Sequence, residues 1–250
     1  MRLTVVGSAP AWALRPNQPS SCYLVEAQGE AIVLDLGQGS LGALAAILPP
    51  ESLRAIFVSH MHADHHVDLI PLRYYLKYGL ERPGRVELHA PAGLRARYDA
   101  FLGEPDFLAD LPGEDVAEGT RTIGPFRVEA RPVTHGLNSV AFRVSAADLA
   151  DAQGLVYSGD CGRWRDLVPL IHPGDTLLCE AFWGTRQAEE GVHHLTARGA
   201  ASAAHAGGAA RLVLTHIPDA NDPYGALDQA MTVFHGTVAL AEPGMQLLIG

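Results

Sequence analysis

The sequence contains little positive charge and almost no lysine. Lys77 is the only lysine among 18 basic residues, and the formal net charge is −10. A surface of this charge repels the phosphate backbone of nucleic acids, which argues against a protein whose whole surface attracts nucleic acid. A local basic groove remains compatible with this composition.

Cysteine and long apolar runs are also scarce. Cys22, Cys161 and Cys179 are widely spaced and form no C-x-x-C pair, which argues against a disulfide framework and against a zinc knuckle. No apolar run approaches the ~20 residues that a transmembrane helix needs. The short apolar run near the N-terminus is better explained as a first strand than as a signal peptide. We therefore expect a cytoplasmic protein without membrane partners.

The remaining composition is that of a globular α/β protein. Hydrophobic residues make up 48% of the 250 positions, which is enough for one large core, and we expect a single domain over residues 1–250. Short β-like runs bounded by Gly, Pro and Asp occupy 3–6, 22–26, 31–34, 55–58, 85–89, 126–132, 140–144, 155–157, 176–179, 211–214, 237–240 and 246–249. Helical patterns occupy 41–48, 67–78, 93–102, 196–205 and 224–234.

The most informative segment is SHMHADH at residues 59–65, directly after an apolar run. Imidazole nitrogen and carboxylate oxygen are ligands that zinc accepts. Residues two apart on an extended backbone point the same way, so His60 and His62 can hold one ion. Asp64 and His65 follow a turn and can face a second ion. A surface loop that is merely rich in histidine is the alternative, and this spacing behind a strand disfavours it.

One loop cannot complete two coordination spheres, and the chain offers further ligands. His135, Asp160 and His216 each follow a strand-like run. Any one of them alone would more often be structural. Because ligands at strand ends can converge on one edge of a layered sandwich, the three together predict a metal centre.

The order of these motifs resembles that of the metallo-β-lactamase superfamily. Residues 60–65 match its H-x-H-x-D-H motif, and the segment at 35–37 resembles its early D-x-G motif. The resemblance implies an α/β fold of four αβ/βα layers, in which two mixed sheets are flanked by helices and carry the site on one edge.

The resemblance also implies two zinc ions and a division of the ligands between them. One ion takes His60, His62 and His135, and the other takes Asp64, His65 and His216. Asp160 bridges them, and Asp35 orients a ligand imidazole. Mn²⁺ or Fe also suits such ligands.

A later motif resembles the ribonuclease Z branch of the superfamily. Glu180 ends a strand-like run, and His194 lies two residues before Thr196, which begins an Ala-rich helix as a candidate N-cap. The resemblance implies that His194 assists phosphodiester cleavage by giving a proton to the leaving oxygen, while Glu180 holds its other nitrogen. His193 is the alternative assignment, and a solvent-facing role is the alternative for His194. The candidate catalytic residues are therefore Asp64, Glu180 and His194.

Two features depart from the tRNA-processing members of that branch. Only 24 residues lie between His135 and Asp160, which leaves no room for the long arm that clamps tRNA. Cys179 occupies a place where the branch commonly has His. We therefore expect a metal-dependent hydrolase that uses a metal-bridging hydroxide and acts on a small phosphodiester or nucleotide.

Three alternatives remain at this stage. The first is a lactone, ester or thioester hydrolase on the same dinuclear site. The second is a ribonuclease Z-type tRNA 3′-processing endonuclease, and the third is a non-hydrolytic metal-binding protein. The family resemblance is the only ground for expecting a homodimer. The other histidines are expected to be structural or, for His66, to support the ligand segment or face solvent; they are His66, His89, His172, His205 and His235.

Overall fold

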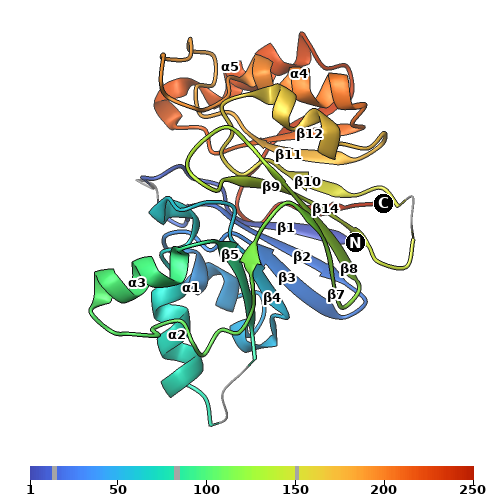
Figure 1. Ribbon diagram of the computed structural model, residues 1–250. Coiled ribbons are helices and arrows are strands. Elements are labelled where there is room, and N and C mark those ends of the chain that lie inside the picture. The colour runs from blue at the N-terminus through green and yellow to red at the C-terminus, as the bar shows by residue number, and fades with distance from the viewer. Residues whose placement is uncertain (13–15, 82–84, 150–151) are drawn as a thin grey trace.

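The computed structural model describes residues 1–12, 16–81, 85–149 and 152–250. Within them, two seven-stranded mixed sheets lie face to face, and helices cover their outer faces (Figure 1). This arrangement confirms the predicted four-layer sandwich.

The first sheet has the strand order β14-β1-β2-β3-β4-β5-β6. Its strands pair antiparallel from β14 to β3 and parallel from β3 to β6. Their bounds are β1 Arg2–Gly7, β2 Cys22–Ala27, β3 Glu30–Leu34, β4 Ala55–Phe57, β5 Glu87–Pro91, β6 Asp115–Val116 and β14 Gln246–Leu248.

The second sheet has the order β13-β12-β11-β10-β9-β8-β7. Strands β7 to β10 pair antiparallel and strands β10 to β13 pair parallel. Their bounds are β7 Gly119–Ile123, β8 Phe126–Pro132, β9 Val140–Ala146, β10 Leu155–Tyr157, β11 Thr176–Glu180, β12 Arg211–Thr215 and β13 Thr237–Leu240.

Five α-helices are seen in the described residues, and each overlaps a helical pattern of the sequence. Helices α1, α2 and α3 lie on the side of the first sheet, whereas α4 and α5 cover the second sheet (Figure 1). Their bounds are α1 Ser40–Ala45, α2 Leu69–Tyr78, α3 Leu94–Leu102, α4 Ala197–Gly207 and α5 Pro223–Met231. Among the described helices, none combines the length and the apolar character that crossing a lipid bilayer requires.

The hydrophobic core is divided into three clusters, one for each interface between layers. Successive side chains of β2 point to opposite faces of the sheet, so this one strand contributes to two of the clusters. Tyr23 and Val25 belong to the cluster between the two sheets, whereas Cys22 and Leu24 belong to the cluster beneath α1 to α3. Because both faces of the central strands are buried, their sequences are nearly continuous apolar runs.

Polar segments follow the strands at one edge of the sandwich, as the sequence predicts. The backbones of the two sheets are joined there by hydrogen bonds from Val140 N to Ser59 O (3.0 Å) and from His216 N to Ser8 O (3.1 Å). The hydroxyl of Tyr23 also lies 2.7 Å from Thr215 Oγ1 across the two sheets. These contacts fix the distance between the loops that carry the candidate ligands.

Candidate metal centre

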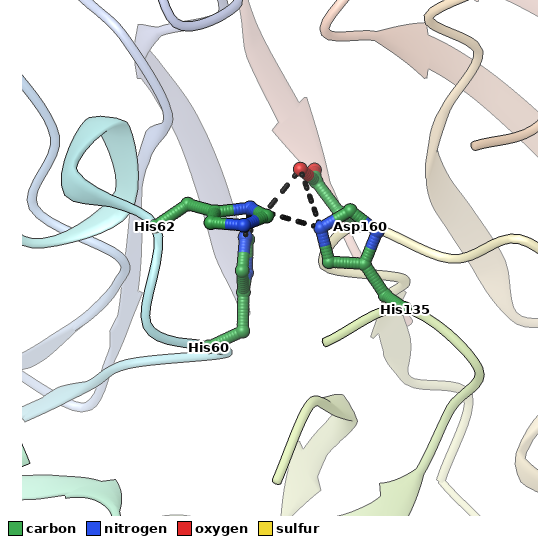
Figure 2. Close-up of side chains that lie close together, drawn as sticks. All are labelled: His60, His62, His135 and Asp160. Atoms are coloured by element: carbon green, nitrogen blue, oxygen red, sulfur yellow. Dashed lines mark hydrogen bonds and ion pairs between the residues drawn. The ribbon is translucent and has the colours of Figure 1, made fainter. Parts of the chain in front are cut away.

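The structure brings all seven candidate metal ligands to this edge, in two groups. In the first, here called the His60 group, the ligand atoms of the four residues lie within 4.8 Å of one another; the members are His60, His62, His135 and Asp160 (Figure 2). His62 Nδ1 lies 3.1 Å from His60 Nε2 and 3.0 Å from His135 Nε2. The side chains come from the loops after β4, β8 and β10.

The second group, here called the His65 group, contains Asp64, His65 and His216. His65 Nε2 lies 3.3 Å from Asp64 Oδ2, and His216 Nε2 lies 3.8 Å from the same oxygen. A short 3₁₀ helix, Ala63–His65, follows His62 and carries Asp64 and His65. The predicted turn in the ligand segment is therefore present.

Asp160 lies between the two groups. Its Oδ2 is 3.5 Å from His60 Nε2 and 3.6 Å from His216 Nε2, while its Oδ1 is 3.4 Å from His65 Nε2. One carboxylate thus contacts imidazoles of both groups. This is the position that a bridging ligand must occupy.

Most of the imidazoles are oriented by a hydrogen bond at the nitrogen that faces away from the groups. Ser59 Oγ lies 3.0 Å from His60 Nδ1, and Ser21 Oγ lies 3.3 Å from His216 Nδ1. His135 Nδ1 donates to the carbonyl oxygen of His193 at 2.6 Å. Such bonds fix the ring and leave Nε2 free to act as a ligand.

Asp35 performs this role for His65 and joins it to two other elements. The carboxylate is fully buried and accepts hydrogen bonds from Ser59 N, Ser59 Oγ, Tyr157 Oη and His65 Nδ1, the last at 2.7 Å. The contact that the family resemblance implied for Asp35 is therefore present. Tyr157, Ser59, Ser21 and the His193 carbonyl were not predicted from the sequence.

The chemistry of these residues fits a cation. His65 Nε2 and Asp160 Oδ1 are buried without a hydrogen-bond partner in the described residues, although buried polar atoms are normally paired. Burial lowers the pKa of His65, but the charges of Asp160 and Asp35 raise it well above the usual value. These carboxylates favour positive charge between the groups, and a metal ion coordinated by nitrogen and oxygen supplies it.

Glu180 and His194 form a pair beside the groups, and the ligand-type nitrogen of His194 also lies within 4.8 Å of those atoms of Asp160 and His216. Glu180 ends β11 and is buried; its Oε1 accepts hydrogen bonds from Cys161 N and Leu195 N and lies 3.0 Å from His194 Nδ1. The His194 ring stacks on Phe182 with centroids 4.6 Å apart, and its Nδ1 also lies 3.9 Å from Asp160 Oδ2. The ring is therefore fixed at the margin of the two groups.

The charge of Glu180 also affects the protonation of this histidine. Burial lowers the pKa of His194, but the hydrogen bond with Glu180 and the charge of that carboxylate raise it above the usual value. His193, the alternative of the sequence analysis, has an exposed side chain. The pairing with Glu180 thus involves His194.

The remaining histidines and cysteines lie outside both groups. His89 is buried between Glu87 and Arg121, and its ring stacks on Phe57. Cys161 is buried next to Asp160, and its Sγ donates to the carbonyl oxygen of Arg163. His66 is buried behind the ligand segment.

A sequence model described as "Beta-lactamase superfamily domain" matches residues 32–217, a range that contains every member of both groups. The chain belongs to this superfamily. An uncharacterized protein of Mycobacterium tuberculosis is 33% identical over 95% of this chain and 88% of its own length. The Bacillus subtilis protein "Probable metallo-hydrolase YhfI" is 24% identical over 98% of both chains.

Solved structures show the same superfamily fold. The crystal structure of YhfI gives a TM-score of 0.86 over 99% of both chains, at 24% identity. Human tRNase Z, short form, gives 0.76 over 100% of both chains, at 23% identity. A diphosphatase from the PhnP family gives 0.73 over 100% of this chain and 98% of its own, at 18% identity.

Proposed function

We propose that this superfamily member is a dinuclear metal-dependent hydrolase that cleaves a small phosphodiester or nucleotide. The observation that carries the proposal is the Glu180–His194 pair beside the two ligand groups. Among the similar structures, tRNase Z and the diphosphatase bear names of enzymes that act on phosphate esters or anhydrides. A second, oriented proton donor next to a metal pair suits a leaving group that must be protonated as it departs.

The residues of the two groups supply the proposed metal sites. His60, His62 and His135 would hold one Zn²⁺, and Asp64, His65 and His216 would hold the other, with Asp160 shared. When bound, two such ions polarise a phosphoryl oxygen and lower the pKa of water to near neutrality.

The chain's own side chains perform the remaining tasks. Glu180 holds Nδ1 of His194 at 3.0 Å, so Nε2 is the nitrogen that can give a proton to the leaving oxygen. Asp64, which is 7% exposed, can accept a hydrogen bond from the attacking water in addition to its role as a ligand. The stack on Phe182 restricts the His194 ring to one orientation, which reduces the entropy lost when the substrate binds.

The shape of the chain between His135 and Asp160 favours a small substrate over tRNA. Strands β9 and β10 lie within this interval and pair directly, with Val144 opposite Leu155. The clamp of the tRNA-processing enzymes has no counterpart in the described part of the interval. We infer that the substrate is recognised at the edge of the sandwich itself.

The proposal is tested with purified protein on a panel of substrates. A phosphodiester such as bis(p-nitrophenyl) phosphate is expected to be hydrolysed, and chelation is expected to abolish the activity. His194→Ala should lower kcat by about 10²–10⁴, the usual contribution of a positioned proton donor, and leave the bound metal unchanged. His205→Ala, an exposed histidine at the end of α4, is the matched control.

Two outcomes contradict the proposal. Lactones or thioesters hydrolysed much faster than phosphodiesters would assign the site to the other hydrolase class. An unchanged kcat in His194→Ala would remove the proton donor from the mechanism.

A further inference from the structure

His62 differs from the other candidate ligands in how its ring is held. The rings of His60, His65, His135 and His216 each have an orienting partner at Nδ1. His62 instead turns Nδ1 toward His60 and His135 (Figure 2), and its Nε2 has no hydrogen-bond partner among the described residues. The side chain is also the exposed member of the His60 group. Its position must therefore be fixed in another way.

The backbone before His62 is held from outside by α3. Arg97 Nη1 donates to the carbonyl oxygen of Met61 at 2.7 Å, and His66 Nε2 lies 3.3 Å from the same oxygen. The Met61 carbonyl and the His62 N–H belong to one planar peptide unit. A hydrogen bond to this carbonyl therefore restricts the rotation of the unit from which the His62 side chain extends.

The other end of the ligand segment is held by the neighbouring residue of the same helix. Tyr98 Oη donates to the His66 carbonyl oxygen at 2.8 Å and lies 2.7 Å from His66 Nδ1. Tyr98 is 4% exposed and stacks on the buried Phe107, with an angle of 9° between the rings. Through Tyr98, α3 thus connects the end of the ligand segment to the hydrophobic core.

We propose that Arg97 is a positioning residue for the metal centre, and that it sets the His62 ring by holding the Met61 carbonyl. The inference rests on the proposed function, because it assumes that the His60 group binds a metal. Arg97 takes the place of the orienting partner that the His62 ring lacks. Because this hydrogen bond lies at the surface, water can replace the guanidinium at the Met61 oxygen when the arginine is removed. The effect should fall on the geometry of the site and much less on the stability of the fold.

Titration of the metal-free protein with Co²⁺, followed by its visible absorption spectrum and by calorimetry, tests the inference. Partners that orient ligands typically change metal affinity by about 10–100-fold, and for Arg97→Ala we expect about tenfold weaker binding of one ion and an altered spectrum. Arg97→Lys keeps a cationic donor and should recover most of the affinity. Arg127→Ala removes another exposed arginine, from β8, and should bind like the wild type, which controls for the lost charge.

The outcomes separate the two proposals. If the wild-type protein takes up no Co²⁺, the proposed function fails and the inference fails with it. If the wild type binds two ions and Arg97→Ala binds them with the same affinity and spectrum, the inference alone is overturned. Equal losses in Arg97→Ala and Arg127→Ala would also overturn it, because the effect would then be general electrostatics.

Discussion

Replacing Asp35 by asparagine should weaken metal binding by forcing His65 into the wrong tautomer. Oδ1 of Asp35 accepts from Ser59 N, a donor that cannot rotate, so the asparagine oxygen must stay there. The amide NH₂ then occupies the position of Oδ2, which is 2.7 Å from His65 Nδ1. Two donors cannot face each other at this distance. The imidazole relieves the conflict by moving its proton to Nε2, which is the atom that faces the metal site.

The size of the effect follows from the contacts. Loss of an orienting partner typically costs about 10–100-fold in metal affinity, which corresponds to about 1.4–2.7 kcal/mol. The fully buried carboxylate also loses charge-assisted hydrogen bonds from Ser59 and Tyr157, at a cost of about 1–3 kcal/mol in unfolding free energy. For a chain of this size, each kcal/mol lowers Tm by about 2–4 °C.

Asp175 provides the matched control. It is also fully buried and accepts hydrogen bonds from Arg143 Nε and Nη2, Gly154 N and His172 N, none of which belongs to the metal groups. Asp175→Asn should lower Tm without changing metal affinity. Competition with a chromophoric chelator measures the affinity, and a thermal melt of the metal-free protein measures the stability. Wild-type affinity in Asp35→Asn, or an equal loss in Asp175→Asn, would refute the tautomer argument.

Three further predictions concern the margin of the site and its supports. Glu180→Gln removes the negative charge that raises the pKa of His194, so His194 should lose its proton at lower pH. The alkaline fall of kcat/KM in a pH–rate profile should then move to lower pH. A fall at the same pH as in the wild type would contradict His194 as the proton donor. In Gly37→Ala the new Cβ would lie 1.9 Å from the Asp64 carbonyl oxygen, and urea denaturation should show a loss of about 1–3 kcal/mol. Gly42→Ala, which meets nothing within 4 Å inside α1, should instead gain about 0.5–1 kcal/mol. Thr196→Ala removes the side chain that accepts from Gly199 N at the start of α4, and should cost about 1 kcal/mol that Thr196→Ser retains.

The periodicity of apolar residues, and the Gly, Pro and Asp residues that bound each run, are sufficient to predict most of the fold. Every predicted strand-like run overlaps an observed strand, and every helical pattern overlaps a helix. Strand β7, with the sequence GTRTI, was missed because it lies at the edge of its sheet and its side chains are largely exposed. A strand without a buried face carries no apolar alternation that a sequence pattern can report. Strand β6 is only two residues long and gives no pattern at all.

The candidate ligands and one orienting group, Asp35, could be named from the sequence, whereas the other groups that orient the ligands could not. Ser21 lies 195 positions from His216, so no local spacing connects them. The partner of His135 is the carbonyl oxygen of His193, and a backbone atom has no signature in the residue type. The contact of Arg97 depends on the packing of α3 against the ligand segment. Such partners become visible only when the tertiary structure is known.

The candidate ligand residues are divided between the two sheets, and this division affects the lifetime of the folded protein. The loop after β4 holds four of the seven candidate ligands, and the loops after β8, β10 and β12 hold the other three. An opening of the sandwich at this edge would therefore separate them. A cation bound there stabilises the closed sandwich by mass action. This stabilisation is about 2.7 kcal/mol when the free cation concentration is 100 times the dissociation constant. Proteases cleave chains that open transiently. If the two groups bind metal as proposed, the supply of metal in the surroundings would govern the lifetime of this protein as well as its proposed activity.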